Sequence, residues 1–513
     1  MKARTVLAVL LVALVLVSPA GATVEPASFV LGVASGEVSK NSAILWTRTE
    51  HGQVRVDLST SPSFASLVLS RMVNVQPNSD GTVRTKVAGL APGTTYHYRF
   101  FDAASGDFSR TGTFSTAPGP TQDVDVRFAF SGDSDGTLNP FTGLPAFNSF
   151  QTLDRVRVEG VDFFMYLGDT IYSDSLFRPL GPADDLEDYR AAYRQNRTFD
   201  ALRDLEAALP IYAQWDDHEV RNDFDPATVD PALLASGLRA FQEYMPVKGY
   251  DDQLGFYRTF RWGRNLQLFV LDERSFRSPS ASAGGVCDNP PGSGVPDVAP
   301  TLPQPIRSAF AAIAPALSSL VPPGCLAAIN DPARTFLGAA QKARFQDDLL
   351  SSQATFKVVF SEDPMQELFA LPYDSWAGYA AERGEILGFI DSNQIGGVVW
   401  LTTDVHANIV NDVFTASFGG SDTGMDEVIV GPIATFTFAQ EINGFTGVPF
   451  AATVFRNNFL LAPRAFGGLG ARCAELDVFA YGSVTYDASA SILTIEVKDD
   501  VGAAVCPPLV VRG

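Results

Sequence analysis

The sequence predicts an α/β layered domain that follows a separate all-β domain. Residues 27–117 read as short strands, alternating or continuously apolar, with turn signals between them. A Pro/Gly-rich linker at 116–121 follows. Beyond it, apolar strands alternate with helix-like segments, a pattern typical of a sheet covered by helices.

The first 22 residues have the features of a Sec-type signal peptide. Lys2 and Arg4 precede an apolar run at 6–17, and Ala20-Gly21-Ala22 fits a cleavage site. The run is shorter than the roughly 20 apolar residues that cross a bilayer, so cleavage is favoured over a retained membrane anchor. We therefore expect a mature chain from residue 23 that is secreted or periplasmic.

The strongly acidic charge restricts the partners. The 513-residue chain carries a net charge of −21, which becomes −23 once Lys2 and Arg4 are removed with the signal. Such a chain repels nucleic acid and anionic membrane surfaces. An anionic substrate therefore needs metal ions or arginines close to it.

The N-terminal domain is predicted at 23–119. Leu90, the Pro92-Gly93 turn and Tyr96 at the start of a strand resemble the tyrosine corner of fibronectin type III β-sandwiches. His51 and His97 belong to this domain, and we expect both at its surface. That leaves two imidazoles for the following domain, since the chain has four histidines.

The α/β domain is predicted at 120–513. Expected strands lie at 126–130, 161–167, 266–271, 356–360 and 397–402, and helix-like segments at 147–158 and 186–209. From about residue 414 the chain reads as strand-rich again, with runs at 427–430 and 493–497. A Pro/Gly/Ala/Ser-rich insert at 278–333 is either the rim of an active site or a surface loop.

Four cysteines in an exported chain predict disulfides. Proximity along the chain favours Cys287–Cys325 and Cys473–Cys506, and two other pairings remain open. None of the cysteines has metal-ligand spacing.

Acidic and imidazole side chains follow the ends of several predicted strands. In α/β sheets, ligands gather at the carboxyl ends of strands. Several carboxylates there would repel one another without cations, and a pair of metal ions resolves this repulsion and supports phosphoester chemistry. Each aspartate alone is equally explained as a helix cap, but a cap needs no imidazole. The motifs are Asp133-Ser134-Asp135, Asp169 with Tyr172, Asp217-His218, and Asp404-Val405-His406.

The ordered motifs Gly-Asp-x-x-Tyr, Trp-Asp-Asp-His-Glu and Asp-x-His resemble the PhoD-like alkaline phosphatase D family of the calcineurin-like metallophosphoesterases. Further similar segments lie at 271–277, 337–341 and 376–383, so the resemblance covers most of the mature chain. It implies a four-layer α/β/β/α metallophosphoesterase sandwich behind the fibronectin-like domain. It also implies a dinuclear or larger metal centre containing Fe(III) and Ca(II).

The resemblance assigns roles to individual residues. Asp169 would bridge the metals, Tyr172 would bind iron as a phenolate, and Asp217 would hold a metal where relatives have asparagine. Asp404 and His406 would each give a ligand to one metal. His218 would face the phosphate and protonate the leaving group. The candidates for phosphate contact are Arg274, Arg277 and Arg383, with a structural salt bridge as the alternative for at least one. Trp376 and Tyr379 either line the pocket or belong to the core.

Two positions depart from the family pattern. Asp133 stands where the family commonly has a cysteine that ligates iron, and an oxygen ligand there suits Fe(III), Ca(II) or Mn(II) better than soft metals. Thr403 replaces a glycine before the Asp-x-His motif.

The function expected from these residues is hydrolysis of small-molecule phosphate mono- or diesters by a hydroxide that the metals activate. The alternatives are phospholipase D-type hydrolysis at a phospholipid surface and a non-catalytic surface protein using the fibronectin-like module.

Overall fold

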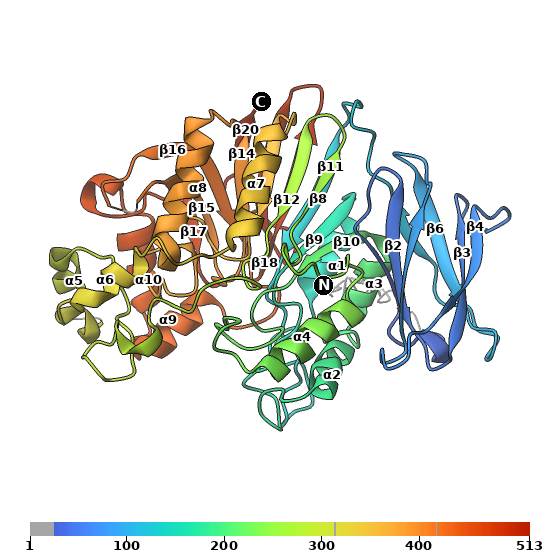
Figure 1. The fold of residues 1–513 in the computed structure, drawn as a ribbon, viewed down its shortest axis with the longest axis horizontal. Coiled ribbons are helices and arrows are strands. Elements are labelled where there is room, and N and C mark those ends of the chain that lie inside the picture. Colours follow the sequence, from blue (N-terminus) through green and yellow to red (C-terminus); the bar gives the residue numbers. More distant parts are fainter. Residues whose placement is uncertain (1–24, 312–313, 417) are drawn as a thin grey trace, which may run out of the picture.

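The computed structural model of the chain describes residues 25–311, 314–416 and 418–513. The predicted signal peptide lies outside these residues. Two sheets stack face to face at the centre, helices cover both outer faces, and a smaller β-sandwich stands at one end (Figure 1). Within the described part of the chain, no helix is both long enough and apolar enough to span a bilayer.

The first central sheet contains the parallel strands β8 (Val126–Ser131), β9 (Phe163–Leu167) and β10 (Pro210–Gln214). The antiparallel strands β18 (Ala480–Asp487), β19 (Ile492–Asp499) and β20 (Leu509–Arg512) extend it on one side. Strands β8 and β10 read as apolar runs because both faces of this part of the sheet are covered.

The second central sheet has the order β11 (Arg258–Trp262), β12 (Leu266–Val270), β13 (Phe356–Phe360), β14 (Val398–Thr402), β16 (Asp422–Ile429), β15 (Asn408–Phe414) and β17 (Cys473–Glu475). Its inner face packs on the first sheet, with Phe128 of β8 edge-on to Phe360 of β13 at 5.9 Å between ring centres. The strands predicted at 266–271, 356–360 and 397–402 are therefore confirmed.

Helices α1 (Gln151–Val158), α2 (Leu186–Asn196), α3 (Asp200–Ala208) and α4 (Pro231–Tyr244) cover the first sheet. Helices α7 (Ala339–Ser351) and α8 (Ala380–Ser392) cover the second. The four-layer α/β/β/α prediction is thereby confirmed.

The segment predicted as one helix-like stretch at 186–209 is divided into α2 and α3. The break is fixed by tertiary contacts: Asn196 donates to the carbonyls of Ser134 and Thr170, and Arg197 turns inward to a buried ion pair with Glu206. These contacts hold the end of α2 beneath the loops that follow β8 and β9.

The N-terminal region is all-β, as predicted. One sheet has the order β4 (Leu69–Asn74), β3 (Gln53–Ser59), β6 (Thr95–Phe101) and β7 (Gly112–Ser115). The tyrosine corner is formed, since the Ala91 amide donates to Tyr96 Oη at 2.9 Å. The other strands, β1 (Val33–Gly36), β2 (Ser42–Arg48) and β5 (Thr82–Ala88), continue the first central sheet because β1 pairs in parallel with β10. The domain boundary at residue 119 stays a prediction. It divides the chain between β7 and β8, whereas the first central sheet joins strands from both sides of it.

The insert carries two short helices, α5 (Gln304–Phe310) and α6 (Pro323–Ile329). Both disulfides favoured by proximity are present, Cys287–Cys325 and Cys473–Cys506. The region after residue 414 is less strand-rich than the sequence suggested, because it also contains α9 (Phe438–Thr446) and α10 (Ala451–Phe455). Thr437 and Gln440 form a capping box at the start of α9. This local helix signal was missed because the apolar residues of the region suggested strands. Helices α9 and α10 lie beside α5 and α6 at the end of the molecule opposite the β-sandwich (Figure 1).

Candidate metal centre

The acidic groups project from sharp turns at the carboxyl ends of three central strands. Asp133, Asp169 and Asp404 follow β8, β9 and β14 and have φ angles of 62°, 50° and 65°. His406, two residues further on, has φ 55°. This left-handed conformation is uncommon outside glycine and costs energy, so its repetition at four polar residues indicates a functional constraint.

These turns bring the predicted ligands together. Ligand atoms of Asp133, Asp169 and His406 lie within 4.8 Å of one another, and so do those of Asp169, Asp217 and His218. Asp169 belongs to both groups, which is the position expected of a bridging carboxylate. Asp404 lies instead with Asp363 and Asp374, in a further group of the same kind. Asp404 and His406 therefore face different groups, although only one residue separates them.

The burial of these carboxylates fits the binding of cations. Both carboxylate oxygens of Asp133 and Oδ1 of Asp217 are buried, and none accepts a hydrogen bond from the protein. Burial raises the pKa of Asp133 to about 7 and, together with the neighbouring carboxylates, raises that of Asp169 well above its usual value. A Cβ at position 431 would collide with Asp133 Oδ2, so Gly431 leaves this oxygen room. Bare carboxylates so placed are stable only when protonated or neutralised by cations.

Tyr172 and His406 complete the first group. Tyr172 Oη lies 2.9 Å from His406 Nε2, and its side chain is buried. The other ring nitrogen of His406, Nδ1, lies 2.8 Å from a carboxylate oxygen of Glu441 on α9. A carboxylate on the far nitrogen fixes the orientation of a ligating imidazole, which leaves Nε2 aimed at Asp133 and Asp169.

His218 stands at the edge of the second group. Its Nδ1 lies 2.5 Å from Asp174 Oδ1, and its ring stacks on Tyr172 at 4.0 Å between ring centres. Nε2 is 4.0 Å from oxygens of both Asp169 and Asp217. Burial alone would lower the pKa of His218, but Asp217 and Asp174 outweigh it and raise the pKa to about 10. In the absence of metal ions the imidazole is thus held protonated, with Nε2 toward the acidic groups.

Arg274 lies behind the acidic groups rather than at the cavity surface. Its guanidinium is fully buried. Nε donates to Asp216 and Nη1 donates to Asp374 at 2.9 Å, while Nη2 forms an ion-pair contact with Asp374 at 2.6 Å. Arg277 shares Asp374 and also bonds Asp363. Asp374 therefore stands between both arginines and the cavity, and a phosphate reaches Arg274 only if this carboxylate moves aside.

Arg383 does not reach the site, contrary to the sequence expectation. Its three donor nitrogens point to the backbone carbonyls of Met365, Phe414 and Thr415, and the side chain is buried. Its place on α8 aims it at the edge of the second sheet, which its position in a family motif could not reveal. Trp376 and Tyr379 are likewise core residues: Trp376 donates to Glu273, and Tyr379 to the carbonyl of Ser278.

Replacing Arg383 with methionine is expected to lower the stability of the fold and leave catalysis intact. The change leaves buried carbonyls without a donor, a loss of about 3 kcal/mol in the free energy of unfolding. Thermal melting and steady-state kinetics check this, with Arg344→Met on the exposed side of α7 as the control. A fall of 100-fold or more in kcat/KM of the folded variant would restore Arg383 as a phosphate ligand.

Several residues of the site were not predicted from the sequence. Asp363 follows β13 and could have been found by the same strand-end rule that identified the other ligands. Asp174 lies two residues after Tyr172, which is a weak signal. Asp374 and Glu441 sit in a loop and a helix with no local signal. Asp135, which resembled half of an Asp-x-Asp pair, is instead turned toward the Thr137 amide, and its ligand atoms join none of the acidic groups.

Thr403, the second departure from the family pattern, strengthens the site. Its hydroxyl donates to the carbonyl of Leu167 at 2.6 Å, and its amide to the carbonyl of Glu362 at 3.0 Å. The first bond ties the end of β14 to the end of β9, so the threonine joins the two sheets between Asp169 and Asp404.

A cavity of about 530 Å³ opens over the acidic groups. Its lining includes residues of the acidic groups, and the insert contributes part of a wall. The lining residues from the acidic groups are Asp169, Asp217, His218, Asp404 and His406. The insert therefore borders this cavity, which favours the first of the two interpretations that the sequence allowed, the rim of an active site. Its wall residues are Ser280, Ser282 and Pro296.

Two stacked mixed sheets with acidic groups at their strand ends define a metallophosphoesterase-type architecture. Comparisons agree. A solved structure of PhoD superposes with a TM-score of 0.70 over 93% of this chain and 92% of its own, at 20% identity. Purple acid phosphatase PPD1 from yellow lupin (Lupinus luteus) seeds gives a TM-score of 0.55 over 94% of this chain and 73% of its own, at 12% identity. At such identities these two likenesses show the fold alone.

The sequence comparisons specify the family. The PhoD-like phosphatase model matches residues 141–461, and the model of the PhoD-like phosphatase N-terminal domain matches residues 16–118. Alkaline phosphatase D of Bacillus subtilis (strain 168) is 27% identical over 430 residues, which is 74% of this chain but 64%, just under two thirds, of that relative. This chain belongs to the PhoD-like phosphatase family.

Proposed function

We propose that this protein is an exported phosphoesterase that hydrolyses phosphate mono- or diesters at the acidic cavity. The observation that carries the proposal is the convergence of buried carboxylates, several of whose oxygens lack a hydrogen-bond partner, with His406, Tyr172 and His218 beneath one cavity. The two disulfides and the predicted signal peptide support export.

The donor set fits hard metal ions. Asp133, Asp169, Asp217 and Asp404 offer carboxylate oxygens, Tyr172 a phenol oxygen and His406 one imidazole, a set that favours Fe(III), Ca(II) or Mn(II) over soft metals. Family resemblance points to Fe(III) with Ca(II). When bound, such ions neutralise the carboxylates and the phosphate and make water nucleophilic near neutral pH.

His218 supplies the acid of the reaction. As water attacks, a new P–O bond forms while the P–O bond to the alcohol breaks, and the leaving oxygen needs a proton. His218 Nε2 faces the acidic groups and its Nδ1 is held by Asp174, so the ring is oriented to give that proton. Phosphate and alcohol are the products of a monoester.

Phospholipid hydrolysis is the second candidate on the same scaffold. The observation that favours it is an apolar cavity, lined by Phe310, Phe455 and Phe459 among others, beside the acidic one. A non-catalytic role is disfavoured because a surface protein gains nothing from burying so many carboxylates.

Metal analysis and a comparison of esters test the proposal. Protein purified from an exporting host is analysed for bound iron, calcium and manganese. Hydrolysis of a phosphate monoester, a diester and phosphatidylcholine is then measured side by side. Bound metal together with turnover of at least one ester is the expected result. A metal-loaded protein that turns over none of the three would contradict a phosphoesterase function.

A further inference from the structure

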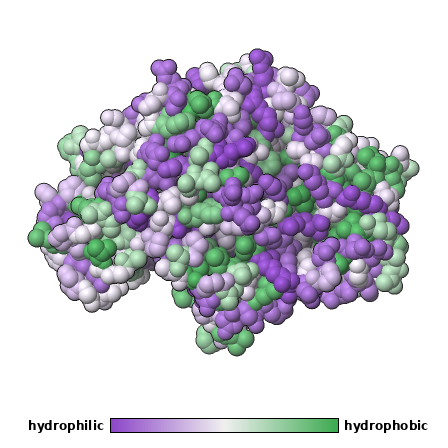
Figure 2. Space-filling view, viewed as in Figure 1, coloured by the Kyte–Doolittle hydropathy of each residue, from purple (hydrophilic) through white to green (hydrophobic). Residues whose placement is uncertain are grey.

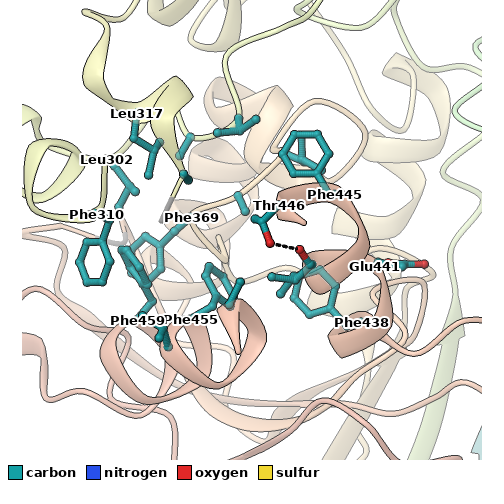
Figure 3. Close-up of a pocket in the computed structure, with 18 residues that line it drawn as sticks. Leu302, Phe310, Leu317, Phe369, Phe438, Glu441, Phe445, Thr446, Phe455 and Phe459 are labelled. Carbon is teal, nitrogen blue, oxygen red and sulfur yellow. Dashed lines mark hydrogen bonds between the residues drawn. The ribbon is translucent and has the colours of Figure 1, made fainter. Parts of the chain in front are cut away.

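A second cavity, of about 320 Å³, lies between the insert and the C-terminal helices. Leu302, Phe310 and Leu317 approach it from the insert, while Phe455 and Phe459 face them from α10 and the short π-helix Arg456–Leu460 that follows (Figure 3). Its volume is at the lower end of the range for small-molecule sites.

Among the described residues, the side chains that line this cavity leave no polar partner for a ligand. Of these described lining residues, only Glu441 and Thr446 carry polar side-chain atoms. The Thr446 hydroxyl donates to the carbonyl of Ile442 at 2.7 Å, as the dashed line in Figure 3 marks. The Glu441 carboxylate bonds His406 of the metal centre instead. A polar occupant would lose its hydrogen bonds to water without replacement, so the occupant must be apolar.

The apolar cavity adjoins the acidic one. Ala370, Leu371, Phe438 and Glu441 line both. Glu441 marks the junction, because it contacts His406 on one side and faces the apolar cavity on the other. One molecule can therefore place an anionic group over the carboxylate cluster and a hydrocarbon group against the phenylalanines.

Over the lobe that carries α5 and α6, apolar side chains are scattered among polar ones (Figure 2). Two of the large exposed apolar residues, Leu371 and Phe445, line the cavity. This arrangement suits a single chain entering the cavity better than a broad membrane contact.

We propose that the substrate is an amphiphilic phosphoester, whose phosphate lies at the metal centre and whose hydrocarbon chain fills the cavity between α5 and α10. The inference rests on the proposed function only in placing the phosphate. The insert thus acts as the specificity-determining part of the site, and the Cys287–Cys325 disulfide ties its two ends together.

Binding of uncleavable phosphonates tests the cavity without requiring turnover. Calorimetry on the metal-loaded protein compares decylphosphonate with methylphosphonate. Each methylene buried strengthens binding by about fourfold, so the long chain is expected to bind at least about 100-fold more tightly. Inorganic phosphate should displace both ligands. Equal affinities, or a decylphosphonate that phosphate does not displace, would overturn the proposal.

Two variants on adjacent residues of α10 locate the chain. Val454 lines the cavity, whereas Thr453 is exposed and does not. Val454→Trp fills the cavity and should weaken decylphosphonate at least about 10-fold while methylphosphonate is unaffected. Thr453→Trp, the matched control, should change neither. Phe445→Gln, at an exposed rim position, tests the same cavity should Val454→Trp fail to fold; it should weaken only decylphosphonate, by about threefold. Equal effects of the two tryptophans would contradict the assignment.

Further ligand pairs separate the sources of the chain and the two proposals. Dihexanoyl phosphatidic acid against glycerol 3-phosphate tests a lipid, and decyl phosphate against methyl phosphate tests a simple alkyl ester. A chain-dependent gain in affinity in either pair supports the cavity assignment, and its absence in both overturns it. If chain-dependent binding is found but no ester is hydrolysed, the proposed function fails and the cavity assignment stands.

Discussion

Replacing His218 with alanine is expected to lower kcat for an alkyl phosphate ester by about 10³-fold while the fold and the bound metals are retained. The reason is the position of its Nε2 beside Asp169 and Asp217, with Nδ1 anchored by Asp174. An alkoxide leaves poorly without a proton. A nitrophenyl ester, whose leaving group is already stable as an anion, should lose at least about tenfold less.

The companion variant Asp217→Ala should lose bound metal as well as activity. Its Oδ1 is buried with no protein partner, so its loss removes a metal ligand as well as activity. Metal analysis of both variants separates the two roles. His51→Ala and His97→Ala are the controls, because these histidines lie in the N-terminal β-domain and bond Asp102 and Thr113. Unchanged turnover in both His218→Ala and Asp217→Ala would contradict the site assignment. Equal losses of kcat on alkyl and nitrophenyl esters would exclude His218 as the acid.

Removing the metals is expected to abolish turnover and to lower the stability of the fold in a pH-dependent way. A ligand present at a thousand times its Kd stabilises the native state by about 4 kcal/mol, and chelation removes that contribution. Burial raises the pKa of Asp133 to about 7 and that of Asp404 well above its usual value. In the metal-free native state these groups therefore hold protons that the unfolded chain has already released.

The sign of the pH effect follows. Between about pH 4 and pH 7 the metal-free native state binds more protons than the unfolded state, so its stability falls as pH rises. Metal binding needs the deprotonated carboxylates, so the loaded protein should gain stability over the metal-free form as pH rises. Melting temperatures at pH 5 and pH 8, with and without chelator, measure both trends.

Asp133→Asn gives the matched test of this argument. It removes one buried ionisable group, so the metal-free variant should be less sensitive to pH and should bind metal weakly. Asp347→Asn, on the exposed side of α7, should behave as the parent. A metal-free protein whose stability rises from pH 5 to pH 8 would contradict the assignment of these carboxylates.

Much of the acidic cluster was predictable because its carboxylates lie where strands end. Asp169 and Asp404 follow apolar runs that form strands in almost any context, and the topology then places them at one edge. Arg383 was misplaced because a motif fixes only its position along α8. The direction of its guanidinium depends on carbonyls that α8 meets only in the folded chain.

Short-range patterns predicted the α/β layering, favoured the disulfide pairing that the structure has, and located most of the side chains that converge in the acidic groups. Apolar periodicity, turn residues and strand-end motifs are local, and burying apolar strands and helix faces leaves few ways to layer them. The tertiary structure alone decided which carboxylates share a metal group, that Asp374 shields Arg274 and Arg277, and that the insert builds a wall. It also joined the N-terminal strands to the central sheet. These features depend on distances between segments far apart in the sequence, which no local pattern encodes.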